Sequence, residues 1–164
     1  MTRSISALRC FLAMLALLCV AGTTANGKQV PFKGTLEGSF TVIAVPPPAI
    51  NRELSATGHA THLGNFTYDF PHTVDRSVTP STAEGYATFT AANGDQVFAF
   101  VSGTATLIGP GVLYVVEMGE IVGGTGRFAN ASGSFVIERL IDAVNLTTVG
   151  EFEGTISSVG SSKH

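Results

Sequence analysis

The feature that most constrains the fold of this 164-residue chain is a strict alternation of residue types that begins at Phe32. From Phe32 to Val42, apolar residues or glycines occupy the even positions, and Lys, Thr, Glu and Ser occupy the odd ones. Because successive side chains of a β-strand point to opposite faces, this pattern predicts a strand with one buried and one solvated face. Pro46-Pro47-Pro48 then ends the strand, since proline cannot donate the hydrogen bonds of a ladder.

Further strand-like segments follow at steady spacing, with almost no helical periodicity. We expect strands over 53–63, 66–78, 85–93, 96–108, 112–122, 131–142 and 147–157. Turn residues separate them: Gly64-Asn65 fits a two-residue hairpin turn, Asn93-Gly94-Asp95 a short glycine turn, and Gly109-Pro110-Gly111 another. Eight strands joined by short sequential turns predict an all-β fold, an eight-stranded antiparallel up-and-down β-barrel.

A glycine-rich segment, Gly123-Gly124-Thr125-Gly126-Arg127-Phe128, separates two of these strands. Glycine reaches positive φ without a steric penalty, so we expect a tight reversal with Gly123 to Gly126 at a hairpin tip. The segment is not a dinucleotide-binding fingerprint, because no helix follows whose N-terminus could hold a phosphate.

This segment resembles the Gly-Gly-(Ser/Thr)-Gly-x-Phe hairpin of the allene oxide cyclase and dirigent-like barrels. The segments Gly58–Thr67 and Thr90–Asp95 are similar to those of small exported bacterial members of this group, whose activity is unassigned. The characterised plant relatives cyclise an unstable fatty-acid epoxide or steer the radical coupling of phenols. The resemblance therefore implies an apolar barrel interior that holds a ligand with a few polar groups. The matching motifs are turns, so they imply a fold and no particular active-site residues.

The N-terminal segment has the pattern of a secretory signal peptide. Arg3 and Arg9 precede the apolar run Cys10–Ala21, and small residues ending at Ala25 follow it. The run of about 12 apolar residues is shorter than the ~20 that span a bilayer. We therefore expect cleavage near Ala25, secretion or delivery to the periplasm, one barrel domain over 26–157 and a flexible tail over 158–164.

Cleavage would remove both cysteines, Cys10 and Cys19, and with them any disulfide or thiol nucleophile. The chain has nine Lys and Arg and twelve Asp and Glu, so losing Arg3 and Arg9 leaves seven against twelve, a net charge of −5. That charge argues against nucleic acid and against anionic membrane surfaces as partners. No segment after Ala25 is apolar for long enough to span a membrane.

His62 is the first candidate catalytic residue. If Gly64-Asn65 closes a two-residue hairpin and His62 faces inward, it lies opposite Thr67 with Asp69 one step along the same face. An imidazole beside a carboxylate could act as a general base. The sequence leaves open which set of side chains of strand 53–63 faces inward. If the other set does, this histidine faces solvent.

The strand predicted over 112–122 carries further catalytic candidates, Glu117 and Glu120, together with Tyr114. This strand carries apolar residues on both faces, so we expect at least one of its carboxylates to be partly buried, with a raised pKa. Arg139 is the natural partner. Both a structural ion pair and a ligand-binding or catalytic role remain open for these residues.

Aromatic side chains are the candidate ligand contacts, and we name Tyr114, Phe40 and Phe89. No cofactor is expected, and no metal, since the mature histidines show no metal-ligand spacing. Asn65, Asn130 and Asn145 each begin an Asn-x-Ser/Thr tripeptide, and the sequence leaves their glycosylation open.

Two function classes remain. The favoured one is an exported barrel that binds a small apolar ligand or acts as an assembly module. The alternative is a cyclase or isomerase acting on a hydrophobic substrate inside the barrel. The absence of a cysteine nucleophile, a metal motif and a recognisable triad favours the first class.

Strands 112–122 and 135–141 are apolar on both faces, unlike 32–42. Whichever set of side chains fills the barrel, the other set forms an apolar patch outside it. We expect a homo-oligomer formed through this wall. Cover by the N-terminal segment or by the loop over 46–53 is the competing explanation.

Overall fold

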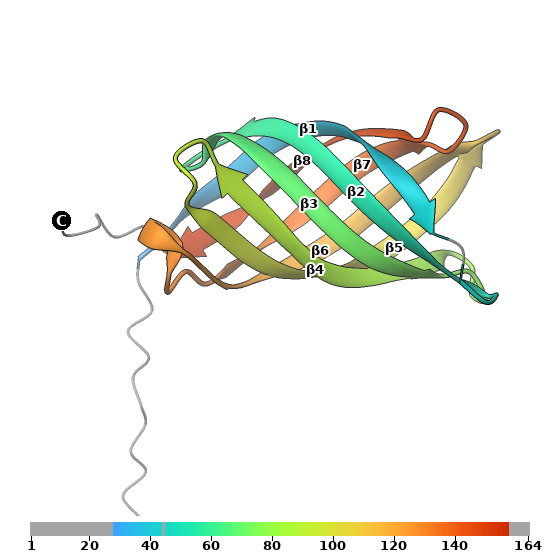
Figure 1. The fold of residues 1–164 in the computed structure, drawn as a ribbon, viewed down its shortest axis with the longest axis horizontal. Helices are drawn as coiled ribbons and strands as arrows, with labels where there is room; N and C mark the ends of the chain where they lie inside the picture. The colour runs from blue at the N-terminus through green and yellow to red at the C-terminus, as the bar shows by residue number, and fades with distance from the viewer. Residues whose placement is uncertain (1–27, 44, 158–164) are drawn as a thin grey trace, which may run out of the picture.

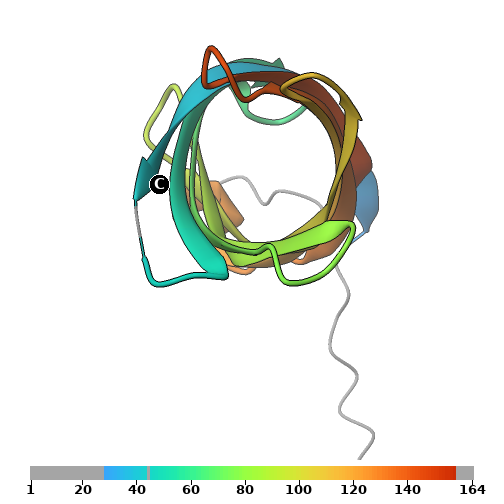
Figure 2. The same cartoon turned by 90° about the vertical axis from the view of Figure 1, so that its right-hand side faces the viewer.

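The computed structural model describes residues 28–43 and 45–157. They form a closed barrel in which each strand pairs antiparallel with its neighbours in sequence and the first strand pairs with the last (Figures 1 and 2). The strands are β1 (Gln29–Ile43), β2 (Ala49–Ala60), β3 (Gly64–Asp75), β4 (Ser81–Ala91), β5 (Gln96–Gly109), β6 (Val112–Gly124), β7 (Gly133–Asp142) and β8 (Thr147–Ser157). The predicted eight-stranded antiparallel barrel is confirmed. The segments assigned to the signal peptide, 1–25, and to the tail, 158–164, lie outside the described residues.

Strand β1 has the two faces that its alternation predicts. Phe32, Leu36 and Phe40 are buried inside the barrel, and the odd-numbered side chains between them are exposed. Gly34 and Gly38 occupy the remaining inward positions, where an added Cβ would collide with β2. These glycines therefore let β1 and β2 approach closely along a strongly coiled part of the sheet.

The turn between β2 and β3 differs from the prediction. Gly64 is already paired with Ala60, so the connection consists of Thr61, His62 and Leu63, and the predicted Gly64-Asn65 turn is wrong. His62 takes the left-handed conformation, with φ of 64°, and Gly64 follows with φ of 66°. The predicted turn at Asn93–Asp95 lies between β4 and β5. Of the predicted turn Gly109-Pro110-Gly111, Pro110 and Gly111 lie between strands and Gly109 ends β5.

The connection after β6 is longer than the expected tight reversal. It runs over 125–132 and contains one turn of 3-10 helix, η1 (Gly126–Phe128). Gly126 has a φ of 54°, and a side chain there would collide with the carboxylate of Asp95. Phe128 and Leu63 are both buried, so side chains from the connections close this end of the barrel.

The interior of the barrel has two chemically different halves. The half toward η1, here called the aromatic end, holds Phe32, Phe66, Phe89, Phe135 and Phe152, whose ring centroids lie 5.0–6.0 Å apart in the contacting pairs. The other half, the polar end, lies toward the β1–β2, β3–β4, β5–β6 and β7–β8 connections, on the right in Figure 1. Buried Arg139, Glu117 and His72 lie in this half. The fold thus separates a hydrophobic core from a cluster of ionisable groups.

No helix in the described part of the chain is long and apolar enough to cross a membrane.

Candidate functional site

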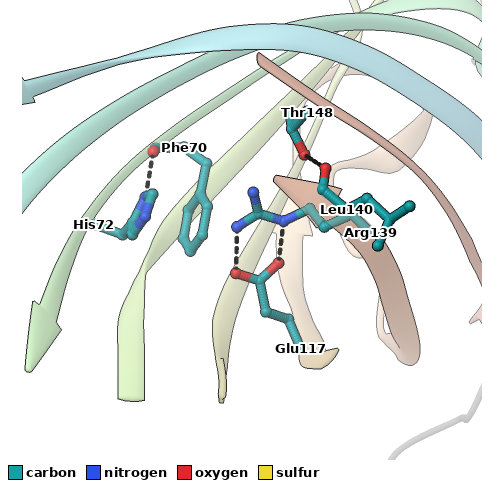
Figure 3. Close-up of polar contacts among 6 residues, drawn as sticks. All are labelled: Phe70, His72, Glu117, Arg139, Leu140 and Thr148. Atoms are coloured by element: carbon teal, nitrogen blue, oxygen red, sulfur yellow. Dashed lines mark hydrogen bonds and ion pairs between the residues drawn. The ribbon is translucent and has the colours of Figure 1, made fainter. Parts of the chain in front are cut away.

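A buried ion pair forms the centre of the polar end. Glu117 on β6 and Arg139 on β7 both point inward and are 1% and 4% exposed. Arg139 Nε donates to Glu117 Oε2 at 2.9 Å, and Nη2 donates to Oε1 at 2.6 Å (Figure 3). This fork geometry uses both carboxylate oxygens. The structure thus joins the two residues that the sequence suggested as partners.

Glycines on the neighbouring strands make room for the pair. An added Cβ at Gly103 on β5 would lie 2.7 Å from Cγ of Glu117, and one at Gly150 on β8 would collide with Arg139. Each charged side chain therefore lies across a glycine of the adjacent strand. Small residues at these two positions are what allow both large side chains to fit inside.

The pair also sets the protonation of its neighbours. Burial disfavours the charged guanidinium, but the carboxylate of Glu117 and its hydrogen bonds hold the pKa of Arg139 above its ordinary value. Burial, reinforced by Glu117, raises the pKa of Tyr68 well above 10. Tyr68 therefore keeps its proton. Within the described residues its hydroxyl is buried without a hydrogen-bond partner.

His72 is a buried neutral histidine at the same end of the barrel. Its ring stacks on Phe70 at 4.3 Å, and its Nδ1 lies 2.9 Å from the Phe70 carbonyl oxygen (Figure 3). Because a carbonyl oxygen only accepts, Nδ1 carries the ring proton and Nε2 is left as an acceptor. Burial lowers the pKa of His72, and the nearby charges of Arg139 and Arg52 add to this effect.

Arg52 is the second cation of the polar end. It faces inward from β2, opposite His72, and its guanidinium lies over the Phe40 ring at 4.9 Å. Burial lowers its pKa, as does the positive charge of Arg139. Its Nε is buried and has no hydrogen-bond partner among residues 28–43 and 45–157. The cluster thus contains donors that the described chain leaves unsatisfied.

The structure does not bring the other sequence candidates into this cluster. His62 is exposed in its turn, and Asp69 is exposed on the outer face of β3, where it accepts a hydrogen bond from Ser55. Thr67 pairs with Thr57, so the proposed pairing of His62 with Thr67 and Asp69 is wrong. The pairing differs because His62 lies in the three-residue connection between β2 and β3 and is not part of either strand.

The remaining candidates divide between the two faces of the barrel. Glu120 is exposed on the outer face of β6. Tyr114 lies on the same face, and its hydroxyl donates to Glu138 at 2.7 Å. Phe40 faces the interior beneath Arg52, and Phe89 lies within the aromatic end. Among the ligand-contact candidates, only Phe40 therefore contacts a charged group of the polar end.

Sequence reasoning did not propose Arg52, Tyr68 or His72 as catalytic or ligand-binding residues. The signal was present as alternation: Phe66, Tyr68, Phe70, His72 and Val74 occupy successive even positions of β3, and all are buried. Extending the buried face of this strand by one step past Phe70 would have placed His72 inside. Arg52 likewise precedes buried Leu54 on the inward face of β2.

The outer surface offers a weaker candidate site. A groove of about 840 Å³ runs over β1 to β4, and threonines together with His59 and Glu37 line it. Its ionisable side chains are exposed, unlike those of the polar end. Within the described ranges, no group of three His, Cys, Asp or Glu residues is placed to hold a metal ion. The polar end is therefore the stronger candidate.

Sequence comparison with protein-family models and with curated proteins gave no match. Comparison of the structure with solved structures found similar proteins. The barrel is similar to the pterocarpan synthase dirigent protein GePTS1, with a TM-score of 0.59 and 14% identity over 80% of this chain and 89% of that one. The pterocarpan synthase dirigent protein PsPTS1 also has a TM-score of 0.59, with 11% identity over 82% and 97% of the two chains. The chain thus has the barrel fold of dirigent proteins.

Proposed function

We propose that this protein is an exported barrel that binds a small, largely apolar ligand at its polar end. The observation that carries the proposal is the buried hydroxyl of Tyr68, which has no hydrogen-bond partner in the described chain. A buried polar group without a partner costs about 1–3 kcal/mol, so a bound molecule that accepts its hydrogen bond would recover that cost. The charges of Glu117 and Arg139 act on the same hydroxyl, and Arg52 and His72 lie farther along this end of the barrel.

Small side chains lie between this region and the connections. Ala83 on β4 and Ala105 on β5 face inward near the ends of their strands and are only half-buried. An eight-stranded barrel is just wide enough to be filled by its own side chains or to hold one small ligand, and small residues at interior positions favour the second arrangement. A few polar groups surrounded by apolar side chains are also the usual composition of a small-molecule site.

The test is a fluorescence titration with N-phenylnaphthylamine, an uncharged probe that brightens in apolar surroundings. Ala83→Phe should fill the polar end and abolish binding. Thr82→Phe, which adds the same ring to the exposed face of the same strand, should leave binding intact. Absence of binding to the unmodified protein, or equal binding to both variants, would overturn the proposal.

The alternative function is that of a cyclase or isomerase. The similar structures are those of proteins named pterocarpan synthase, and the polar end contains a neutral imidazole near a carboxylate. Such groups could move a proton in a bound hydrophobic substrate. Turnover of a hydrophobic substrate that is lost in His72→Gln, while probe binding is retained, would favour this alternative.

Export and assembly belong to the same proposal. Sequencing the N-terminus of secreted protein should find Asn26 or a close neighbour, whereas an intact Met1 would argue against cleavage. The outer faces of β6 and β7 expose Met118, Val136 and Leu140, which supports a homo-oligomer formed through this wall. Light scattering should detect that oligomer, and a monomeric protein would reject it.

A further inference from the structure

The polar end contains more positive than negative charge. Glu117 is its buried carboxylate, and both of its oxygens are used by Arg139. Arg52 therefore adds a second guanidinium to an interior in which Glu117, the buried carboxylate of the described residues, is already paired. An arginine remains protonated in proteins, so this excess is present at neutral pH.

The groups that surround Arg52 do not neutralise it. The residue across the ladder on β3 is His72, which is neutral, and the charges acting on Arg52 are those of Arg139 and Arg76. The ion pairs within residues 28–43 and 45–157 join other side chains. A half-buried guanidinium without a counter-charge favours binding of an anion, because burial strengthens the attraction between opposite charges.

The approach to Arg52 is apolar. Val42 lies directly opposite it on β1 and is 47% exposed, and Ile43 follows. At the same end, the β3–β4 and β7–β8 connections expose Val78 and Val144, and the end of β5 exposes Ile108. Several exposed apolar side chains gathered at one end of a barrel are typical of a surface that contacts an apolar molecule.

We propose that the ligand is a monoanionic organic acid, with Arg52 binding its carboxylate and the exposed apolar side chains of the polar end contacting its body. This inference rests on the function proposed above and adds the charge of the ligand to it. A planar guanidinium can donate two parallel hydrogen bonds to a carboxylate. A single negative charge would balance the two arginines against Glu117.

Isothermal titration calorimetry with two probes of equal shape tests the charge. Naphthalene carboxylate and naphthalene carboxamide differ in charge while sharing one apolar body. The carboxylate should bind at least about tenfold more tightly, and Arg52→Gln should bring its affinity down to that of the amide, as expected for the loss of a charge-assisted hydrogen bond. Arg52→Lys should retain part of the preference.

Arg76→Gln is the matched control, because it removes one positive charge from an exposed residue near Arg52. It should change the affinity for the carboxylate less than about twofold, since exposed charges are screened by salt. Equal affinity for the two probes, or equal loss in the Arg52 and Arg76 variants, would overturn the anion inference and leave ligand binding standing. Failure of both probes to bind would count against the binding function itself.

Discussion

The two ends of the barrel share one backbone architecture but are stabilised differently. In the aromatic end, the Phe152 ring packs against Phe32, Phe66, Phe89 and Phe135, so burial and ring packing act in the same direction. In the polar end, the attraction within the ion pair is opposed by the desolvation of both charges. The comparison indicates that the aromatic end stabilises the fold, whereas placing charged groups in the interior of the polar end lowers the free energy of unfolding.

The largest effect should come from breaking the ion pair on one side. Glu117→Gln leaves Arg139 buried without its counter-charge, and we expect a loss of about 3–5 kcal/mol in the free energy of unfolding. Urea denaturation measures it. The double variant Glu117→Leu with Arg139→Met should regain most of the loss, because both desolvation penalties disappear. Glu120→Gln, on the outer face of the same strand, is the control and should change stability by about 0.5 kcal/mol or less.

Removing an aromatic ring should cost nearly as much but should not be rescued in this way. Phe89→Ala deletes a fully buried ring that contacts Phe32, Phe66 and Phe152, and we expect a loss of about 3–5 kcal/mol. No paired substitution at the polar end should restore it. Tyr86→Ala, on the exposed face of the same strand, provides the control in the same denaturation series. Similar losses in the two variants would contradict the assignment of Phe89 to the stabilising core.

A smaller effect should follow from adding one methyl group at a glycine that contacts an aromatic ring. At Gly119, a Cβ would collide with the ring of Phe135. Overpacking of this kind costs about 1–3 kcal/mol, so the melting temperature of Gly119→Ala should fall. Gly109→Ala, where a Cβ would lie 4.0 Å from its nearest neighbour, should melt close to the unmodified protein.

The smallest effect is a pH dependence that belongs to the polar end alone. Burial lowers the pKa of His72 in the folded state, so below about pH 6.5 the unfolded chain binds the proton more readily. Stability from this group is therefore complete above pH 6.5 and decreases as the pH falls toward the lowered folded-state pKa. Arg52, Arg139 and Glu117 are the charges that face it.

Denaturation midpoints of the unmodified protein and of His72→Gln, measured between pH 7.5 and pH 5, test this dependence. The variant should lose less stability over that range, and His59→Gln, an exposed histidine, should behave as the unmodified protein does. Parallel curves for all proteins would show that His72 is not the group responsible.

The sequence predicted the strands well where alternation was regular. The strand over 147–157 has its predicted bounds, and 112–122 differs from β6 by two residues at one end. The prediction misplaced the turn after β2 because positive φ angles occur at both His62 and Gly64. In the sequence, only the glycine indicates such a backbone conformation, so the turn was assigned to it.

The polar end was predicted only in part because contacts between strands depend on register. Glu117 and Arg139 were recognised as partners since both lie in apolar strands. Arg52 and His72, on β2 and β3, become neighbours only once the register is known, and the misplaced turn gave the wrong one. Register shifts at Phe98/Ala99 and Leu107/Gly109 further change which residues of β5 and β6 face each other. Such irregularities are decided by packing across the sheet.

The pairing of β1 with β8 has a consequence for how the chain folds. Gly34 lies opposite Phe152, so the barrel closes through contacts between residues near opposite ends of the described sequence. Such long-range contacts must be formed against a large loop-closure entropy, which makes folding slow compared with that of helical proteins of similar size. Until β8 is available, β1 and β7 each present an unpaired edge that can recruit strands from other molecules. A circular permutant that joins β8 directly to β1 and opens the chain at the β2–β3 turn should therefore move the closing pairing to β2 and β3, and these two strands should then present the unpaired edges during refolding.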